Sequence, residues 1–321
     1  MSVLIFVETA EGTAKKSSLE AVAYGAELAR MTSTEATAIV LGELSNEELQ
    51  KIGNFGAKKV LHGTDSRLND QLIVPFANAL AEAFAKENAQ ILVLAKSSLG
   101  DAVAARLAAK LKAGLVSNVT ELPDLSNGFK VKRSIYTGKA FAETEVKGDK
   151  KIIAIKKNAF TPVLTEDLAA VESFTPALND ADFSVKITGT EKQTGDVLLP
   201  EADIVVSGGR GLKGPENWGI IEDLAKALHA ATACSKPVSD ADWRPHHEHV
   251  GQTGIKVSPN LYIAAGISGA IQHLAGVNSS KVIVVINKDP EAPFFKAADY
   301  GIVGDVFDIL PRLTQAVKNM N

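Results

Sequence analysis

The sequence has little of what marks secreted, membrane or nucleic-acid-binding proteins. Cys234 is the only cysteine among 321 residues, which excludes an intrachain disulfide and a cysteine-built metal site and indicates a reducing compartment. The apolar runs are too short to span a bilayer, and the opening stretch MSVLIFVETAEG lacks the basic region of a signal or transit peptide and is typical of a first β-strand. The formal net charge of −4 gives no basic excess for phosphate backbones. These absences predict a cytoplasmic protein whose partners are small molecules or other proteins.

Length and hydrophobic pattern predict two α/β domains, because 321 residues exceed the usual size of one. The apolar runs VLIFVE, ATAIVLG, KKVLHG and ILVLAKS alternate with amphipathic segments at 17–31, 45–55, 73–88 and 101–113. This alternation is typical of βαβ units in a parallel sheet. Between 115 and 160, FKVKRSIYTGKAFAETEV and KKIIAIKKNAF have strand character with turn glycines between them, which predicts an antiparallel addition to that sheet.

The domain boundary is expected in the segment 161–200, where prolines and polar residues interrupt the periodicity. A new α/β alternation begins at ADIVVSGGRG and continues to the end of the chain. We therefore predict an N-terminal α/β domain at 1–190 and a C-terminal doubly wound α/β domain at 191–321.

The first candidate ligand element is ADIVVSGGRGLKGPENWGIIEDLAKALHA, a strand followed by a glycine-rich turn and a helix. Such a layout presents backbone N–H groups and a helix N-terminus to a phosphate or a polar ring. Gly208, Gly209 and Gly211 would let a ligand approach the backbone, and Arg210 would add donors. A tight turn with a solvated arginine explains the same residues, so this motif alone leaves both interpretations open.

The second element, YIAAGISGAIQHLAG, repeats this logic. Ser268 is expected to cap a helix that begins at Ala270, and Gly266 and Gly269 would keep side chains out of the ligand space. His273 lies one helical turn further on, within reach of the same ligand. A lone helical histidine is more often structural, but the neighbouring glycines and serine favour a ligand contact.

Further candidate residues follow in the C-terminal segment KVIVVINKDPEAPFFKAADYGIVGD. Asn287 ends an apolar strand, where open α/β sheets bind ligands. Asp305 could bind a ligand hydroxyl, although capping the helix that begins near Val306 is the favoured interpretation. The run HHEH at 246–249 lacks the spacing of a zinc motif, which favours a polar loop that enters the ligand site over a metal site.

Together these motifs resemble the electron transfer flavoprotein α subunit. VSGGRGLKGPENW, VGQTGIKVSPNLYIAAGISGAIQHLAG and INKDPEAPFFKAADYGIVGD stand in the order and spacing of that family, and the resemblance covers the full length. It implies an electron carrier rather than an enzyme, with FAD in the C-terminal domain and an N-terminal domain that packs on a β subunit. Flavin dehydrogenases, such as the acyl-CoA dehydrogenases of fatty acid β-oxidation, would be the donors, and a membrane-associated quinone reductase the acceptor. The alternative is a stand-alone FAD- or NAD-dependent oxidoreductase acting on a small molecule.

The resemblance also implies a set of FAD contacts. By position these are Arg210, Ser235, Lys236, Val250, Gly251, Gln252, Thr253, Ser268, Gly269, Ala270, Ile271, Gln272, His273, Asn287, Asp305 and Val306. Lys236 and His273 would lie nearest the isoalloxazine ring, where a cation or donor raises the potential of the first reduction, and Thr253 would bond to its redox-active nitrogen. The family commonly has arginine where this chain has Lys236, and lysine keeps the charge without the planar fork.

Overall fold

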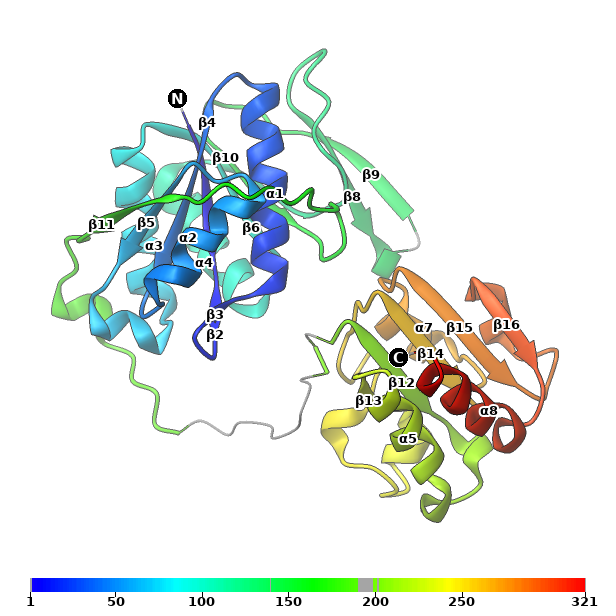
Figure 1. Cartoon of the computed structure of the whole chain (residues 1–321). Coiled ribbons are helices and arrows are strands. Elements are labelled where there is room, and N and C mark those ends of the chain that lie inside the picture. Colours follow the sequence, from blue (N-terminus) through cyan, green and yellow to red (C-terminus); the bar gives the residue numbers. More distant parts are fainter. Residues whose placement is uncertain (1, 139, 190–198, 201, 321) are drawn as a thin grey trace. The chain divides into compact units, whose positions relative to one another are not determined.

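The chain forms two compact units, Met1–Thr190 and Glu191–Asn321 (Figure 1). The computed structural model describes residues 2–138, 140–189, 199–200 and 202–320. Each unit is a mainly parallel sheet with helices packed on it, so the predicted α/β class with an N-terminal antiparallel addition is confirmed. In the part of the chain that the structure describes, no helix is long and apolar enough to cross a bilayer.

The N-terminal sheet has nine strands among the described residues, in the order β11-β5-β4-β1-β6-β10-β7-β8-β9. Neighbours from β11 through β7 are parallel, whereas β7 with β8 and β8 with β9 are antiparallel. A small antiparallel hairpin of β2 (Thr9–Ala10) and β3 (Thr13–Ala14) follows the first strand. The strands of the large sheet are β1 (Ser2–Val7), β4 (Glu35–Leu41), β5 (Lys59–Gly63), β6 (Ala89–Ala95), β7 (Gly114–Val119), β8 (Lys130–Ile135), β9 (Ala140–Glu145), β10 (Lys151–Ile155) and β11 (Ala170–Phe174).

Two details of this sheet differ from the sequence prediction. The antiparallel addition consists of β8 and β9, whereas β10 lies between β6 and β7 and is parallel to both. Four of its five residues are buried, as expected for a strand covered on both faces. Within the predicted connection 161–200, β11 adds to the edge of the sheet beside β5. Both differences depend on pairing with strands far away in the sequence.

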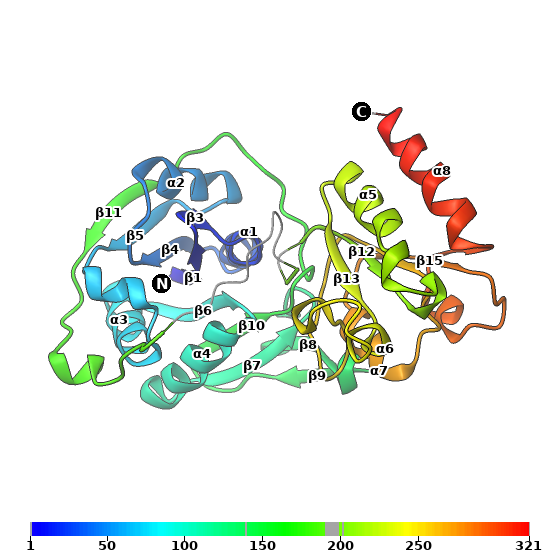
Figure 2. The ribbon, with the colours of Figure 1, turned by 90° about the horizontal axis from the view of Figure 1, so that it is seen from below.

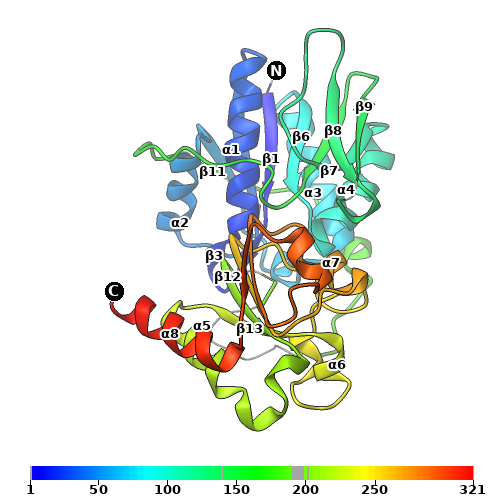
Figure 3. The same ribbon diagram turned by 90° about the vertical axis from the view of Figure 1, so that its right-hand side faces the viewer.

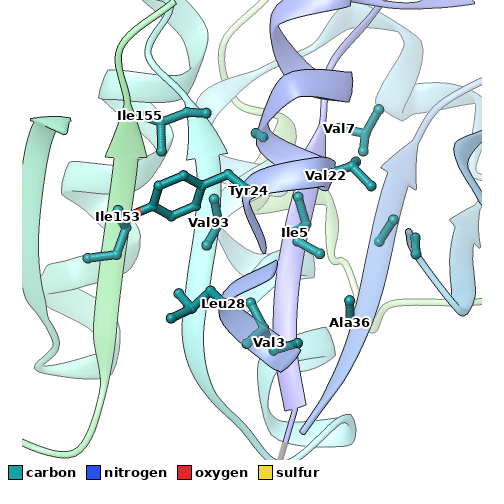
Figure 4. Packing of buried hydrophobic residues seen from close by; sticks show 14 of the residues in the cluster. Val3, Ile5, Val7, Val22, Tyr24, Leu28, Ala36, Val93, Ile153 and Ile155 are labelled. Atoms are coloured by element: carbon teal, nitrogen blue, oxygen red, sulfur yellow. The ribbon is translucent and has the colours of Figure 1, made fainter. Parts of the chain in front are cut away.

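Helices cover both faces of the N-terminal sheet (Figure 2). On one face lie α1 (Lys16–Met31) and α2 (Asn46–Lys51), and on the other α3 (Ile73–Lys86) and α4 (Ser98–Leu111). Figure 4 shows Tyr24 and Leu28 of α1 against Val3, Val93 and Ile153 of the strands. The Tyr24 hydroxyl donates to the Glu121 carbonyl at 3.0 Å. Short 3₁₀ turns complete the unit: η1 (Ile52–Phe55), η2 (Ser66–Asp70), η3 (Tyr136–Gly138) and η4 (Asp180–Phe183).

The C-terminal unit contains a parallel sheet of five strands among the described residues, in the order β13-β12-β14-β15-β16. Its strands are β12 (Ile204–Gly208), β13 (Ala231–Cys234), β14 (Leu261–Ala265), β15 (Val282–Asn287) and β16 (Tyr300–Val303). In chain order, β13 pairs on one side of β12 and β14 pairs on the other side. The winding direction therefore reverses between β12 and β14, the point where open α/β sheets form a ligand crevice at the carboxyl ends of their strands.

Helices lie on both faces of this second sheet, which confirms the predicted double winding. On one face α5 (Gly219–Ala227) and α8 (Val306–Lys318) pack beside each other (Figure 3). On the other lies α7 (Ile271–Val277). The remaining short elements are η5 (Arg210–Leu212), η6 (Pro215–Asn217), α6 (Lys236–Ser239), η7 (His246–Glu248) and η8 (Pro293–Ala297).

Candidate functional site

Two glycine turns pack against each other at the point where the winding reverses. The Gly209 N–H donates to the Ala265 carbonyl at 2.9 Å, and the Gly211 N–H donates to the Gly266 carbonyl at 3.0 Å. A Cβ on Gly209 would overlap the Gly266 carbonyl oxygen, and one on Gly211 would lie 2.6 Å from the Gly266 Cα. Gly266 itself has φ +64°, a left-handed conformation that favours glycine. These glycines therefore allow two stretches of backbone to meet.

For these glycines the sequence left two interpretations open, and the structure supports the tight turn. The sequence suggested that Gly208, Gly209 and Gly211 leave room for a ligand, but protein atoms fill the space where each side chain would be. At Gly208 these atoms belong to Trp218 and Leu212. The glycines nevertheless shape the site, because the contact that they permit closes one side of the crevice.

A cavity of about 830 Å³ opens beside these turns, a volume within the range of cofactor sites. Most of the residues predicted from the family resemblance line it. These are Arg210, Ser235, Lys236, Val250, Gly251, Gln252, Thr253, Ser268, Ala270, Gln272, His273 and Asn287. Gly211 and Gly266 of the glycine turns and His249 of the HHEH loop, all expected near the ligand, line the cavity as well. The structure adds five residues that the sequence analysis did not propose for the site: Pro237, Asp240, Ala241, Ile267 and Asp289.

Four predicted residues are absent from the described lining of the cavity. Asp305 caps α8, because its Oδ1 accepts from the Phe307 N–H at 3.0 Å, and this hydrogen bond lowers the pKa of the carboxyl. The favoured interpretation of Asp305 as a cap is thus confirmed. Val306 is buried in the core under α8, and Ile271 is exposed at the start of α7. Gly269 has φ +84°, and a Cβ there would meet Phe294.

The predicted cap of α7 is wrong. The helix begins at Ile271 with Ala270 as its N-cap and without a side-chain cap hydrogen bond. Ser268 lies further back, since Gly269 turns the chain before the helix starts. The Ser268 carbonyl accepts from the Phe294 N–H at 3.0 Å, while its side chain lines the cavity. Its hydroxyl is therefore placed for a ligand rather than for the helix.

Charged and amide groups line the outer part of the cavity. Arg210 is exposed in η5, and Lys236 pairs with Asp240 at 3.1 Å, with both side chains at least half exposed. Asn287 is committed to the protein on two sides: its Nδ2 donates to the Ile267 carbonyl and its Oδ1 accepts from the Asp289 N–H, both at 3.0 Å. Asn287 therefore fixes the turn after β14 as well as lining the cavity.

The inner wall contains a buried histidine. His273 is 6% exposed, its Nε2 lies 3.0 Å from the Tyr262 hydroxyl, and its ring meets Phe294 edge-on at 5.6 Å. Burial, assisted by the like charge of His249, lowers the pKa of His273 to about 4. At neutral pH the His273 side chain is therefore an uncharged imidazole, able to donate or accept a hydrogen bond but without a positive charge.

The HHEH run divides between structural contacts and the cavity. His246 hydrogen-bonds to the Ser239 hydroxyl at 2.8 Å, and Glu248 accepts from Arg244 Nε at 2.8 Å. His249 is 7% exposed and lines the cavity. Over the described ranges, no three His, Cys, Asp or Glu side chains gather in a way that could hold a metal ion. As expected for a polar loop that enters the ligand site, the run reaches the cavity, and it does so through His249.

Comparisons with known proteins agree with this geometry. A model of the electron transfer flavoprotein domain matches residues 3–181, and a model of the electron transfer flavoprotein FAD-binding domain matches 198–278. The chain is similar to proteins named electron transfer flavoprotein subunit alpha. The one from Bacillus subtilis is 36% identical over 99% of this chain and 98% of its own length. Those from Syntrophomonas wolfei and Mycobacterium leprae are 37% and 35% identical, each over 98% of both chains.

The doubly wound unit with its cavity at the strand reversal is an FAD-binding domain of an electron-carrying flavoprotein. The chain belongs to the electron transfer flavoprotein α-subunit family. This confirms the predicted family, the FAD cofactor and the role of electron carrier rather than enzyme. Membership of an α-subunit family also implies a β subunit as partner.

Proposed function

We propose that this chain is the FAD-binding subunit of a heterodimer that accepts electrons from flavin dehydrogenases, such as acyl-CoA dehydrogenases, and passes them to a membrane-associated quinone reductase. Its place would then be fatty acid β-oxidation, with the domain 1–190 packed on the β subunit. The observation that carries the proposal is the cavity at the strand reversal, whose described lining comes entirely from the C-terminal unit. A cytoplasmic location is supported by the single buried thiol of Cys234, which needs no oxidising compartment.

The residues of the cavity fit an FAD. The cofactor joins an apolar ring system to a doubly charged pyrophosphate, and the cavity combines apolar surface with Arg210, Lys236 and a set of hydroxyl and amide groups. Ser268, Gln252 and Thr253 are exposed to it and supply hydrogen-bond donors. Bound FAD supplies the redox chemistry, since its isoalloxazine ring takes up and releases electrons.

The protein's own contribution is binding and tuning. We assign Arg210 to the anionic part of FAD, because guanidinium forks suit phosphate oxygens. Lys236 would add positive charge at the opening of the cavity, and His273 an uncharged buried ring in its inner wall. The predicted residues outside the lining support the site indirectly: Gly269 and Ile271 set the turn and the start of α7, and Asp305 and Val306 begin α8.

Flavin content and donor specificity test this function. The chain is expressed with and without a β subunit, and FAD per α chain is measured by absorbance. We expect tight binding in the pair and weaker retention by α alone, since a site completed by a partner is incomplete without it. Fragments 191–321 and 1–190 serve as a matched pair, of which only the first should retain flavin.

Anaerobic reduction assays then distinguish an electron carrier from a stand-alone enzyme. An acyl-CoA dehydrogenase with its substrate should reduce the bound flavin, whereas NADH alone should not. Full FAD binding by the α chain alone, together with reduction by NADH in the absence of any dehydrogenase, would instead establish a stand-alone oxidoreductase.

A further inference from the structure

His249 ends the HHEH run and lies against the turn that follows it. Backbone hydrogen bonds close this turn: the Gly251 N–H donates to the Ile255 carbonyl at 3.2 Å, and the Ile255 N–H donates to the His249 carbonyl at 2.8 Å. A Cβ on Gly254 would lie 2.7 Å from His249 Nδ1, and one on Gly251 would lie 3.2 Å from Nε2. The two glycines therefore leave room for the imidazole ring beside a turn that itself lines the cavity.

The ring nitrogens of His249 are open to a ligand. His249 is 7% exposed and lines the cavity. Among the described residues neither nitrogen makes a hydrogen bond, and neither belongs to the buried polar atoms that lack a partner, so each keeps some accessible surface. His273 is the opposite case, because its Nε2 lies 3.0 Å from the Tyr262 hydroxyl and its Nδ1 is completely covered. Of the two histidines in the cavity wall, His249 is therefore the one whose nitrogens can reach a bound molecule.

The groups that face His249 favour an uncharged ring. Burial lowers the pKa of His249, the charges of Lys236 from α6 and His246 from η7 lower it further, and Asp240 opposes them only in part. From α7, His273 also faces the ring, but it is itself uncharged at neutral pH. A neutral imidazole donates from one nitrogen and accepts at the other. His249 can therefore pair with either a donor or an acceptor of a ligand.

A ligand that fills the cavity removes water from the His249 nitrogens. A polar atom left without a partner in a dry site is destabilising, so the bound molecule must offer a matching group. FAD has such groups along its whole length, in the carbonyl and nitrogen atoms of the isoalloxazine ring, the ribityl hydroxyls, the phosphate oxygens and the adenine ring. The cofactor can therefore replace the water at an open imidazole nitrogen.

From this geometry we infer that His249 is a further FAD-binding residue, which forms a hydrogen bond to the cofactor through a ring nitrogen. The inference rests on the proposed place of FAD in the cavity. It adds a contact that the family resemblance does not mark, since the marked positions of this segment begin at Val250.

Substitution of His249 in the α–β complex tests this contact, with the dissociation constant of FAD measured by flavin fluorescence. His249→Leu removes both nitrogens and should weaken FAD binding by about tenfold, the loss expected for one hydrogen bond. His249→Gln keeps a donor and an acceptor on a side chain of similar length and should bind FAD like the wild type. His247→Leu is the matched control, since His247 is exposed in the same run and absent from the described lining of the cavity. It should leave the dissociation constant unchanged.

Chemical modification tests the open nitrogens in the wild-type complex. Diethyl pyrocarbonate acylates accessible imidazole nitrogens, and mass spectrometry locates the modified residues. After removal of FAD, His249 should react, and with FAD bound it should be protected. His273 should react in neither state, because its nitrogens are bonded or covered. This measurement still decides if His249→Leu does not fold.

Wild-type affinity in His249→Leu would overturn the inference. So would an equal loss of affinity in His249→Leu and His249→Gln, which would show that the ring only packs, and so would a reactivity of His249 that FAD does not change. The proposed function is judged separately: a wild-type complex that binds no FAD contradicts that function, whereas normal FAD binding by His249→Leu contradicts only the contact from His249.

Discussion

Replacement of Gly209 by alanine should destabilise the C-terminal unit. A Cβ at this position would overlap the Gly266 carbonyl oxygen and lie 2.8 Å from both the Gly266 carbonyl carbon and Ile267 Cγ1. Backbone atoms cannot rotate away, so the two turns must separate. Overpacking of this kind costs about 1–3 kcal/mol, and loss of the 2.9 Å hydrogen bond from Gly209 to Ala265 adds about 1 kcal/mol. We expect the free energy of unfolding to fall by roughly 2–4 kcal/mol.

Urea unfolding followed by circular dichroism measures this change, with FAD content as a second readout. Gly219→Ala is the matched control: it lies in the same unit, at the start of α5, and its Cβ would meet nothing within 4 Å. Alanine there should be neutral or stabilise by up to about 1 kcal/mol. Equal unfolding free energies for the two variants would show that the contact between the glycine turns does not matter.

Three further outcomes follow from charges and burial. Because the pKa of His273 is lowered from 6.5 to about 4 in the folded chain, the unfolded chain binds the proton first as the pH falls. The free energy of unfolding should therefore fall by about 3 kcal/mol between pH 6.5 and 4. Urea unfolding of His273→Gln at several pH values should not show this fall. Asp240 offsets the charge of Lys236 at 3.1 Å. Redox titration should therefore find the reduction potential of FAD higher in Asp240→Asn, lower in Lys236→Ala and preserved in Lys236→Arg. Unchanged potentials in all three variants would show that Lys236 does not affect the potential of the flavin. Burial raises the pKa of Cys234 to about 12, so a disulfide reagent should modify it only as the chain unfolds, and rapid reaction with the native protein would contradict this burial.

Local pattern predicted most of the fold, and the differences arise where pairing is long-range. The apolar runs became strands, and the helices formed within a few residues of the expected positions. In contrast, β10 and β11 depend on partners that no local pattern identifies. The run KKIIAI is apolar enough for either a central or an edge strand, and only its insertion between β6 and β7 makes it central. At the edge, β11 is mixed in polarity because, among the described strands, it pairs on one side only.

The site could be predicted where the family resemblance marks positions, and less well where tertiary contacts decide a role. The glycine turns were correctly placed beside the site, but the sequence could not show that Gly209 and Gly266 would face each other. Likewise Ser268 has the side chain of a cap, yet a left-handed Gly269 separates it from the helix. Asp240, by contrast, comes from a segment whose approach to the cavity depends on the packing of the whole unit.

The charged Lys236 lies at the opening of the cavity and the uncharged His273 in its inner wall. The two residues should therefore respond differently to salt and to a partner. Lys236 is 57% exposed, so its field would reach a flavin in the proposed site through water and be weakened by salt. His273 is 6% exposed and uncharged, so it adds no charge that salt could screen. A partner that covers the opening would exclude water from Lys236 and strengthen its effect, while leaving His273 as it was. Changes in potential on assembly should therefore originate at the exposed lysine, and the contribution of the buried histidine should be the same in the free and assembled chain.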